Sequence, residues 1–277
     1  MIRSLTFDFP GLSLYRMVNL LGISRSMLYR RPMKTSSPIP ELAAIERIVM
    51  LFLGYGYRRV YRALRKEGLE TSEYRTRKLM KENGLMARRP QSKGVTRAAL
   101  RDRRAANLFK GLKVDGPNQI WVGDTTLVRT ASGAIYLAAL LDAYSRKVVS
   151  WHLSRRTDAE LVRACLDKVL DRRKPPKGWI HHSDQGSTYT AQGYVRRIRD
   201  CGGRVSLSQP GRPRDNAIAE SFFRTLKLEE VDRNRYETFL EADASIDNYM
   251  NTIYNQSRMH SALGYLSPEE FEAKESS

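Results

Sequence analysis

Three acidic residues stand out because of where they fall in the sequence. Asp124 interrupts a β-branched and aromatic run at residues 120–128, and aspartate is unfavourable within strands. Asp184 follows a short apolar segment at residues 179–182, and Glu220 lies within a segment of helical periodicity. A buried carboxylate is costly unless it is paired or binds a metal. These residues are therefore candidates for a shared site.

A site with three carboxylates is suited to hard divalent cations. Mg²⁺ prefers oxygen ligands, usually a few carboxylates together with water and phosphate. Without cations, three such groups repel one another and take up protons. Two ions about 3.5–4 Å apart can activate an attacking oxygen and stabilise the leaving oxygen in phosphoryl transfer. The trio predicts metal-dependent chemistry on a phosphodiester.

Each acidic residue also has a plainer interpretation. Asp184 begins Asp-Gln-Gly, which taken alone is typical of an ordinary turn. Glu220 could form a surface pair with Lys227. Asp142 competes with Asp124 for the role of the acid in the sheet, although its Asp-Ala-Tyr-Ser-Arg context favours a connection between strands.

The helix that contains Glu220 supports the functional interpretation. On a wheel of about 100° per residue, Asn216, Glu220 and Lys227 fall within about 40° of each other, at the border of an apolar stripe. A carboxylate and a cation therefore share one line beside the core. His181 and His182 have no partner at metal-binding spacing, so we interpret them as structural or adjacent to the site.

The charge is concentrated in the first part of the chain. The net charge is +18, and residues 1–113 contain 25 Lys and Arg against 8 Asp and Glu, whereas residues 114–277 contain 23 against 22. Such a field attracts a polyanion. No amphipathic anchor accompanies the charge, so nucleic acid is favoured over an anionic membrane. No apolar run is long enough to span a bilayer and no signal peptide is visible, so we expect a cytoplasmic, nucleoid-associated protein.

The basic part reads as small helical modules. Residues 1–35 contain a helix-turn-helix pattern, although any small helical hairpin could look similar; Arg25, Ser26 and Tyr29 are its candidates for base contacts. Residues 41–86 predict helices at 41–53, 57–66 and 73–83, and residues 87–113 form a basic linker. The candidate DNA contacts of the three helices are Arg58, Arg59, Arg62, Arg75 and Lys78.

From residue 114 the pattern changes to mixed α/β. Three strands are predicted between residues 120 and 153, joined by short links as an antiparallel meander. Helices and short strands then alternate, in the order β-β-β-α-β-α-β-α, with helices predicted at residues 215–231 and 240–255. This order predicts a hairpin sheet extended by crossover units, spanning residues 114–277 with a helical tail.

The acidic motifs resemble those of a known family. Trp-x-x-Asp-Thr-Thr around Asp124, His-Ser-Asp-Gln-Gly around Asp184 and Asp-Asn-Ala-x-x-Glu-Ser-Phe-Phe-x-x-Leu-Lys around Glu220 are similar to the signature of IS3-type insertion-sequence transposases, in the retroviral integrase superfamily. The 35 residues between Asp184 and Glu220 match the family's DD(35)E spacing, and Lys227 falls where the family has a basic residue near DNA. The likeness extends over nearly the whole chain.

The resemblance implies an RNase H-like catalytic domain, with a mixed five-stranded sheet flanked by helices. It implies that Asp124, Asp184 and Glu220 bind two Mg²⁺ or Mn²⁺ ions, while Lys227 holds a phosphate and Asn216 positions the same DNA strand. The implied reaction is cleavage and strand transfer at the terminal repeats of an element. The expected partners are double-stranded DNA, further copies of the chain and an upstream-frame protein or fusion. Two other functions remain open: a DNA-binding regulator without catalysis, and an RNase H-type nuclease.

Overall fold

The computed structural model describes residues 40–87, 106–209 and 212–275. The chain divides into two compact units, residues 1–43 and 44–277, and only residues 40–43 of the first unit are described. The predicted helix-turn-helix at residues 1–35, with Arg25, Ser26 and Tyr29, therefore lies outside the described residues. So does most of the predicted linker at residues 87–113.

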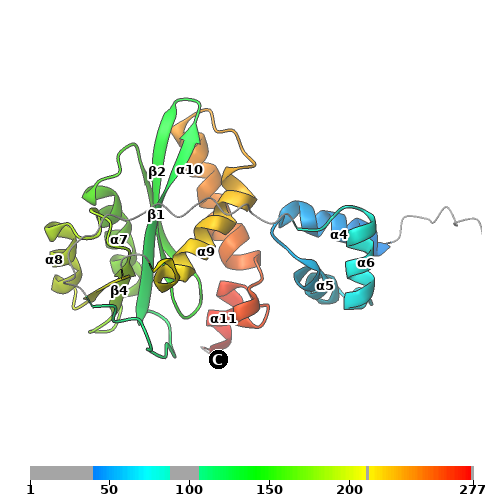
Figure 1. Ribbon diagram of the computed structural model, residues 1–277, viewed down its shortest axis with the longest axis horizontal. Helices are drawn as coiled ribbons and strands as arrows, with labels where there is room; N and C mark the ends of the chain where they lie inside the picture. The colour runs from blue at the N-terminus through cyan, green and yellow to red at the C-terminus, as the bar shows by residue number, and fades with distance from the viewer. Residues whose placement is uncertain (1–39, 88–105, 210–211, 276–277) are drawn as a thin grey trace, which may run out of the picture. The chain divides into compact units, whose positions relative to one another are not determined.

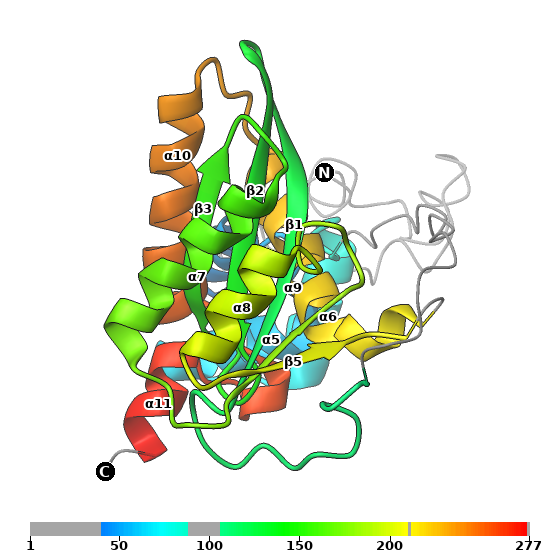
Figure 2. The ribbon, with the colours of Figure 1, turned by 90° about the vertical axis from the view of Figure 1, so that its left-hand side faces the viewer.

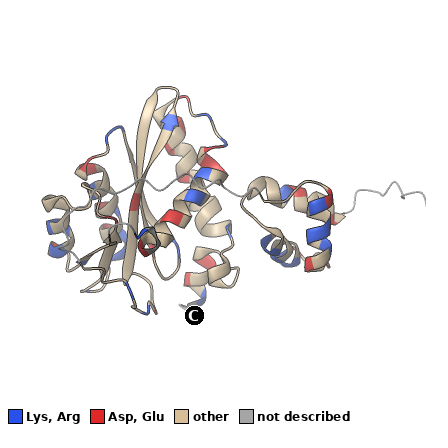
Figure 3. Ribbon diagram, in the orientation of Figure 1, with Lys and Arg blue, Asp and Glu red and all other residues tan. Residues whose placement is uncertain are grey.

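Three helices precede the sheet, as the sequence predicts: α4 (Pro40–Leu51), α5 (Tyr57–Lys66) and α6 (Glu73–Glu82). Their buried faces share one core that includes Ile45, Leu64 and Met80. Ser72 caps α6, since its Oγ accepts a hydrogen bond from the Arg75 backbone N–H at 3.2 Å. Much of the surface of α5 and α6 carries Lys and Arg side chains (Figure 3).

The sheet is mixed and five-stranded, which confirms the predicted fold class. Its strands are β1 (Ile120–Thr130), β2 (Gly133–Asp142), β3 (Val148–Ser154), β4 (Ile180–Ser183) and β5 (Arg204–Leu207). They lie side by side in the order β3-β2-β1-β4-β5, with β1, β2 and β3 antiparallel and β1, β4 and β5 parallel (Figure 1). The meander and the crossover units are thus joined at β1.

Helices cover both faces of the sheet. On one face lie α7 (Ala159–Arg173) and α8 (Gln192–Asp200), packed on side chains such as Trp121. On the other face lie α9 (Ala217–Leu226) and α10 (Phe239–Asn248), packed on side chains such as Val122 (Figure 2). Neighbouring residues of β1 therefore bury their side chains in opposite cores, as the period of a strand requires.

Two long helices predicted from the sequence are interrupted. The segment predicted at residues 215–231 consists of a 3₁₀ turn, η1 (Pro213–Asn216), then α9, then a π-helical turn, η2 (Lys227–Val231). The helix predicted at residues 240–255 is α10 followed by a π-helical segment, η3 (Tyr249–Ser257). A π turn inserts a residue into the helical repeat, so it changes which side chains face inward.

The last described elements are a short 3₁₀ turn, η4 (Ser261–Leu263), and α11 (Pro268–Glu275). The sequence predicted a helical tail here without separating these two elements. Among the described residues, none of the helices has the length and apolarity that crossing a bilayer requires.

Candidate active site

Parallel pairing of β1 with β4 places Asp124 beside Asp184. Val122 of β1 lies opposite His182 of β4, and β4 ends at the next residue, Ser183. If this register is continued by two residues, Asp124 comes level with Asp184. Both carboxylates therefore stand where β4 ends, at the kind of sheet edge where α/β proteins bind ligands.

Helix α9 brings the third carboxylate to the same edge. Asn216, immediately before α9, is only 5% exposed, and its Nδ2 donates a hydrogen bond to the Gly123 carbonyl oxygen at 3.2 Å. Ala219 packs into the core on the sheet. Since Glu220 follows Asn216 by about one helical turn, it lies on the same side of the helix, toward the part of β1 that contains Asp124.

The electrostatics of Asp124 show that these groups act on one another. Its pKa is raised from 3.8 to about 7, first by burial and then by the negative charge of Asp184, with a further contribution from Glu220. The Thr125 backbone N–H, which donates to Asp124 Oδ1 at 2.7 Å, opposes the rise, and so does the positive charge of Lys227. The three predicted acids and the predicted cation therefore share one electrostatic site.

The chemistry of this donor set fits a hard divalent cation. The three side chains offer carboxylate oxygens only, and burial together with the negative charges of Asp184 and Glu220, which raise the pKa of Asp124, makes its charge one that a cation would stabilise. Across the described ranges, no three His, Cys, Asp or Glu side chains already stand close enough to hold a metal ion. Asp184 is exposed to solvent.

The plainer interpretations have mixed outcomes. Asp184 does organise a turn, because its Oδ1 accepts a hydrogen bond from the Gly186 backbone N–H at 2.9 Å. This turn is compatible with a role at the sheet edge. Glu220 and Lys227, both partly buried, do not form an ion pair in the described chain. Asp142 is the last residue of β2 rather than part of the connection, but its side chain organises that connection, since its carboxylate accepts backbone hydrogen bonds from Tyr144 and Ser145 as well as from Asn118.

The two histidines are structural. His181 Nε2 is 2.8 Å from the Tyr194 hydroxyl, and burial lowers the pKa of His181 to about 3. His182 Nδ1 lies 2.8 Å from Ser206 Oγ, and His182 Nε2 contacts the carbonyl oxygen of Asp215. Both imidazoles are thus buried, hydrogen-bonded members of the core, which agrees with the structural interpretation from the sequence.

Gly123 is a residue of the site that sequence reasoning missed. A Cβ atom there would lie 2.9 Å from the Leu140 side chain and 3.2 Å from His181 Nε2. The glycine next to Asp124 therefore allows close packing of β1 against its neighbours. The signal was present in the sequence as a glycine within a β-branched strand, which often marks such a close approach.

The structure does not test the predicted DNA contacts, but it locates several of them. Arg58, Arg62, Arg75 and Lys78 are exposed on α5 and α6, where phosphates can reach them. Arg59 is instead partly buried and lines a cavity beside α9. Lys227, at the end of α9, is also partly buried. Asn216 is buried and bound to Gly123, a position that favours a role in holding α9 to β1.

The five-stranded sheet and its flanking helices place the chain in the integrase-core class of polynucleotidyl transferases, as two family models show. Residues 114–213 and 202–268 match two family models, each described as an integrase core domain. Residues 41–93 match a model described as an HTH-like domain. These matches agree with an RNase H-like catalytic domain preceded by a helical DNA-binding region.

Comparison with individual proteins identifies the family within this class. The chain is 40% identical to the transposase for insertion sequence element IS904 of Lactococcus lactis over 79% of this chain and 87% of that protein. It is 41% identical to transposase InsF for insertion sequence IS3A of Escherichia coli over 57% of this chain and 55% of that protein. A crystal structure of the BIV integrase catalytic core is similar at 19% identity and a TM-score of 0.44, over 57% of this chain and 96% of that one. The chain belongs to the family of insertion-sequence transposases, as its motifs predicted.

Proposed function

We propose that this transposase uses Asp124, Asp184 and Glu220 to hold two Mg²⁺ or Mn²⁺ ions, and that it cleaves and joins DNA strands at the ends of an insertion sequence. One observation carries the assignment of the site. The parallel register of β1 and β4, continued two residues beyond its last pair, would set Asp124 level with Asp184, in agreement with a pKa of Asp124 that burial raises first and the charges of Asp184 and Glu220 raise further.

The residues divide the work as follows. Asp124 would contribute a carboxylate to both ions, and Asp184 and Glu220 would each contribute one to a single ion. Divalent ions bound there would activate the attacking oxygen, water in cleavage and a 3′-hydroxyl in strand transfer, and stabilise the leaving oxygen. Lys227 holds a DNA phosphate as a point charge. Asn216 keeps α9, and with it Glu220, in register with β1 through its hydrogen bond to Gly123.

The other parts of the chain bind the DNA ends and assemble the active complex. Residues 1–35, including Arg25, Ser26 and Tyr29, and the exposed cations of residues 41–86 grip the terminal repeats. Two DNA ends must be joined, so the active form on DNA is at least a dimer. An upstream-frame protein or fusion is a further partner, and the cytoplasm and nucleoid are the sites of action.

The test is a cleavage assay with purified protein, Mg²⁺ and labelled element ends, with and without an upstream fusion. We expect Asp184→Asn to abolish strand cleavage and to leave DNA binding intact. Asp200→Asn, which changes an exposed acid at the end of α8, is the matched control and retains both activities. Unchanged cleavage by Asp184→Asn would overturn the site assignment.

The same assay separates the alternatives. A DNA-binding regulator would bind the ends, and no variant would differ because none would cleave. An RNase H-type nuclease would cut RNA–DNA hybrids without strand transfer. Either result would contradict the proposed reaction.

A further inference from the structure

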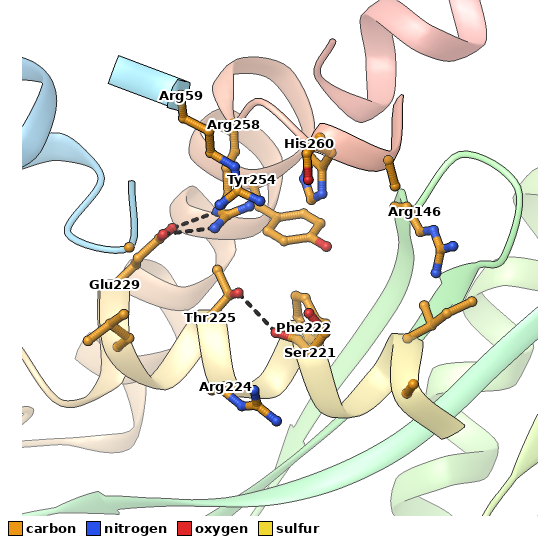
Figure 4. Close-up of a pocket in the computed structure, with 16 residues that line it drawn as sticks. Arg59, Arg146, Ser221, Phe222, Arg224, Thr225, Glu229, Tyr254, Arg258 and His260 are labelled. Carbon is orange, nitrogen blue, oxygen red and sulfur yellow. Dashed lines mark hydrogen bonds and ion pairs between the residues drawn. The ribbon is translucent and has the colours of Figure 1, made fainter. Parts of the chain in front are cut away.

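A cavity of about 470 Å³ lies beside α9, and none of the three acids lines it (Figure 4). Ser221 and Thr225 of α9 line one side of it. Arg146, from the connection between β2 and β3, and His260, from the segment before η4, reach into it from other sides, and Arg59 of α5 closes a further side. Elements far apart in the sequence thus converge on one hollow.

The cavity contains positive charge without a matching negative charge. Arg258 is balanced, because its guanidinium donates to both carboxylate oxygens of Glu229 at 2.8 and 3.0 Å. Arg59 and Arg146 form no ion pair with any described residue. Both are partly buried, and burial is the largest cause that lowers the pKa of each. A buried cation is costly unless it is paired, so the cavity is suited to an anion.

The backbone of Arg146 has a conformation that is uncommon for residues other than glycine. Arg146 has a φ of 61°, in the left-handed region that glycine adopts at no steric cost. Its backbone N–H donates to the Asp142 carbonyl oxygen at 2.9 Å. The connection therefore holds Arg146 in a fixed orientation, although glycine would suit the backbone better.

A second observation points to a ligand. Burial lowers the pKa of His260 to about 3, so its imidazole is neutral. Its Nε2 is buried and has no hydrogen-bond partner within the described chain. Figure 4 shows the ring directed into the cavity. A neutral N–H donor there and the Ser221 hydroxyl are suited to the oxygens of a phosphate group.

We propose that this cavity binds a backbone phosphodiester of DNA, with Arg59 and Arg146 as charged donors and Ser221 and His260 as neutral donors. The proposal rests on the proposed function in one respect, that DNA crosses α9 to reach the acids. Ser221 directly follows Glu220, and successive helical residues point about 100° apart. The bound phosphate thus lies on the side of α9 next to the one that carries Glu220.

The sharpest variant is Arg146→Gly, because it removes the guanidinium and relieves the left-handed backbone. Lys174→Gly is a matched control, since Lys174 is exposed, has a φ of 44° and lies at the end of α7. Affinity of the full chain for a labelled element end is measured against salt concentration. The slope of log K against log salt is negative, and losing one phosphate contact decreases its magnitude by about 0.9. We expect this decrease, with roughly tenfold weaker binding, for Arg146→Gly only.

Equal slopes for wild type and Arg146→Gly would overturn the proposal. Inorganic phosphate serves as a second probe, with thermal unfolding measured against chloride of equal ionic strength. If Arg146→Gly removes stabilisation by phosphate but leaves the DNA slope unchanged, the cavity binds a free anion and the DNA proposal is wrong. Asp184→Asn keeps the full slope; if that variant still cleaves DNA, the active-site assignment fails while the result at the cavity stands.

Discussion

Replacing Asp124 with asparagine should stabilise the metal-free protein while abolishing its catalysis. Asparagine has nearly the shape of aspartate, and its Oδ1 can still accept the hydrogen bond of the Thr125 backbone N–H. It removes the charge that burial, Asp184 and Glu220 make unfavourable. A site built to hold cations is thus expected to lower stability in their absence.

The magnitude follows from the pKa of Asp124. Because its folded-state pKa is raised, its contribution to stability is fully present below about pH 4 and is lost as the pH rises through about 7. The difference between 3.8 and about 7 corresponds to about 4 kcal/mol at pH 8 and to about 1.5 kcal/mol at pH 5. The carboxylates can move apart, so we expect a gain of about 2–4 kcal/mol at pH 8.

The assay is urea unfolding of wild type, Asp124→Asn and the control Asp200→Asn, each in EDTA at pH 5 and pH 8. The stability that Asp124→Asn gains over the wild type should increase by about 2 kcal/mol from pH 5 to pH 8. The stability difference between Asp200→Asn and the wild type should stay constant. Mg²⁺ should then stabilise the wild type more than Asp124→Asn. If Asp124→Asn is no more stable than wild type at pH 8, the carboxylate cluster is not a source of repulsion and the electrostatic reasoning is wrong.

Three further predictions concern the contacts that position α9. Glu229→Gln should lower the free energy of unfolding in urea by about 3–5 kcal/mol, because it leaves Arg258 buried without its charge partner. The double variant with Arg258→Met should recover part of this stability. A double variant less stable than Glu229→Gln would contradict this reasoning. Gly54→Ala should cost about 1–3 kcal/mol, since its Cβ would lie 2.7 Å from Glu229 Oε1; an unchanged midpoint would refute the contact. Asn216→Ala should lower the free energy of unfolding by about 1–3 kcal/mol, because it removes the hydrogen bond to Gly123. It should also slow cleavage more than it weakens DNA binding. A purely structural role would leave the cleavage rate per folded molecule unchanged.

Local patterns predicted most of the elements and the acidic residues. The helix at residues 57–66 was predicted with its observed bounds, and the strand around Asp124 differs at one end only. The Asp142 connection was also predictable, because aspartate bonds to nearby backbone N–H groups in turns. These features depend on neighbours a few residues apart, which a sequence pattern contains.

The features that the sequence missed depend on distant partners. Glu229 is buried in a π turn because it pairs with Arg258, 29 residues further along the chain. Arg59 shares its helix and residue type with exposed arginines, and only the packing of α5 beside the cavity distinguishes it. Asn216 was predicted to contact DNA. The sequence pattern did not indicate its hydrogen bond to Gly123, because the two residues are 93 positions apart. Periodicity within one element contains no information about such partners.

The most direct test of the central claim is a titration of the protein, on a DNA end, with Mn²⁺ followed by electron paramagnetic resonance. Convergence of Asp124, Asp184 and Glu220 predicts two bound ions per active site in the wild type. It also predicts weaker or fewer bound ions in each of Asp124→Asn, Asp184→Asn and Glu220→Gln, with wild-type binding in Asp200→Asn. Identical Mn²⁺ binding by the wild type and all three active-site variants would contradict a shared metal site.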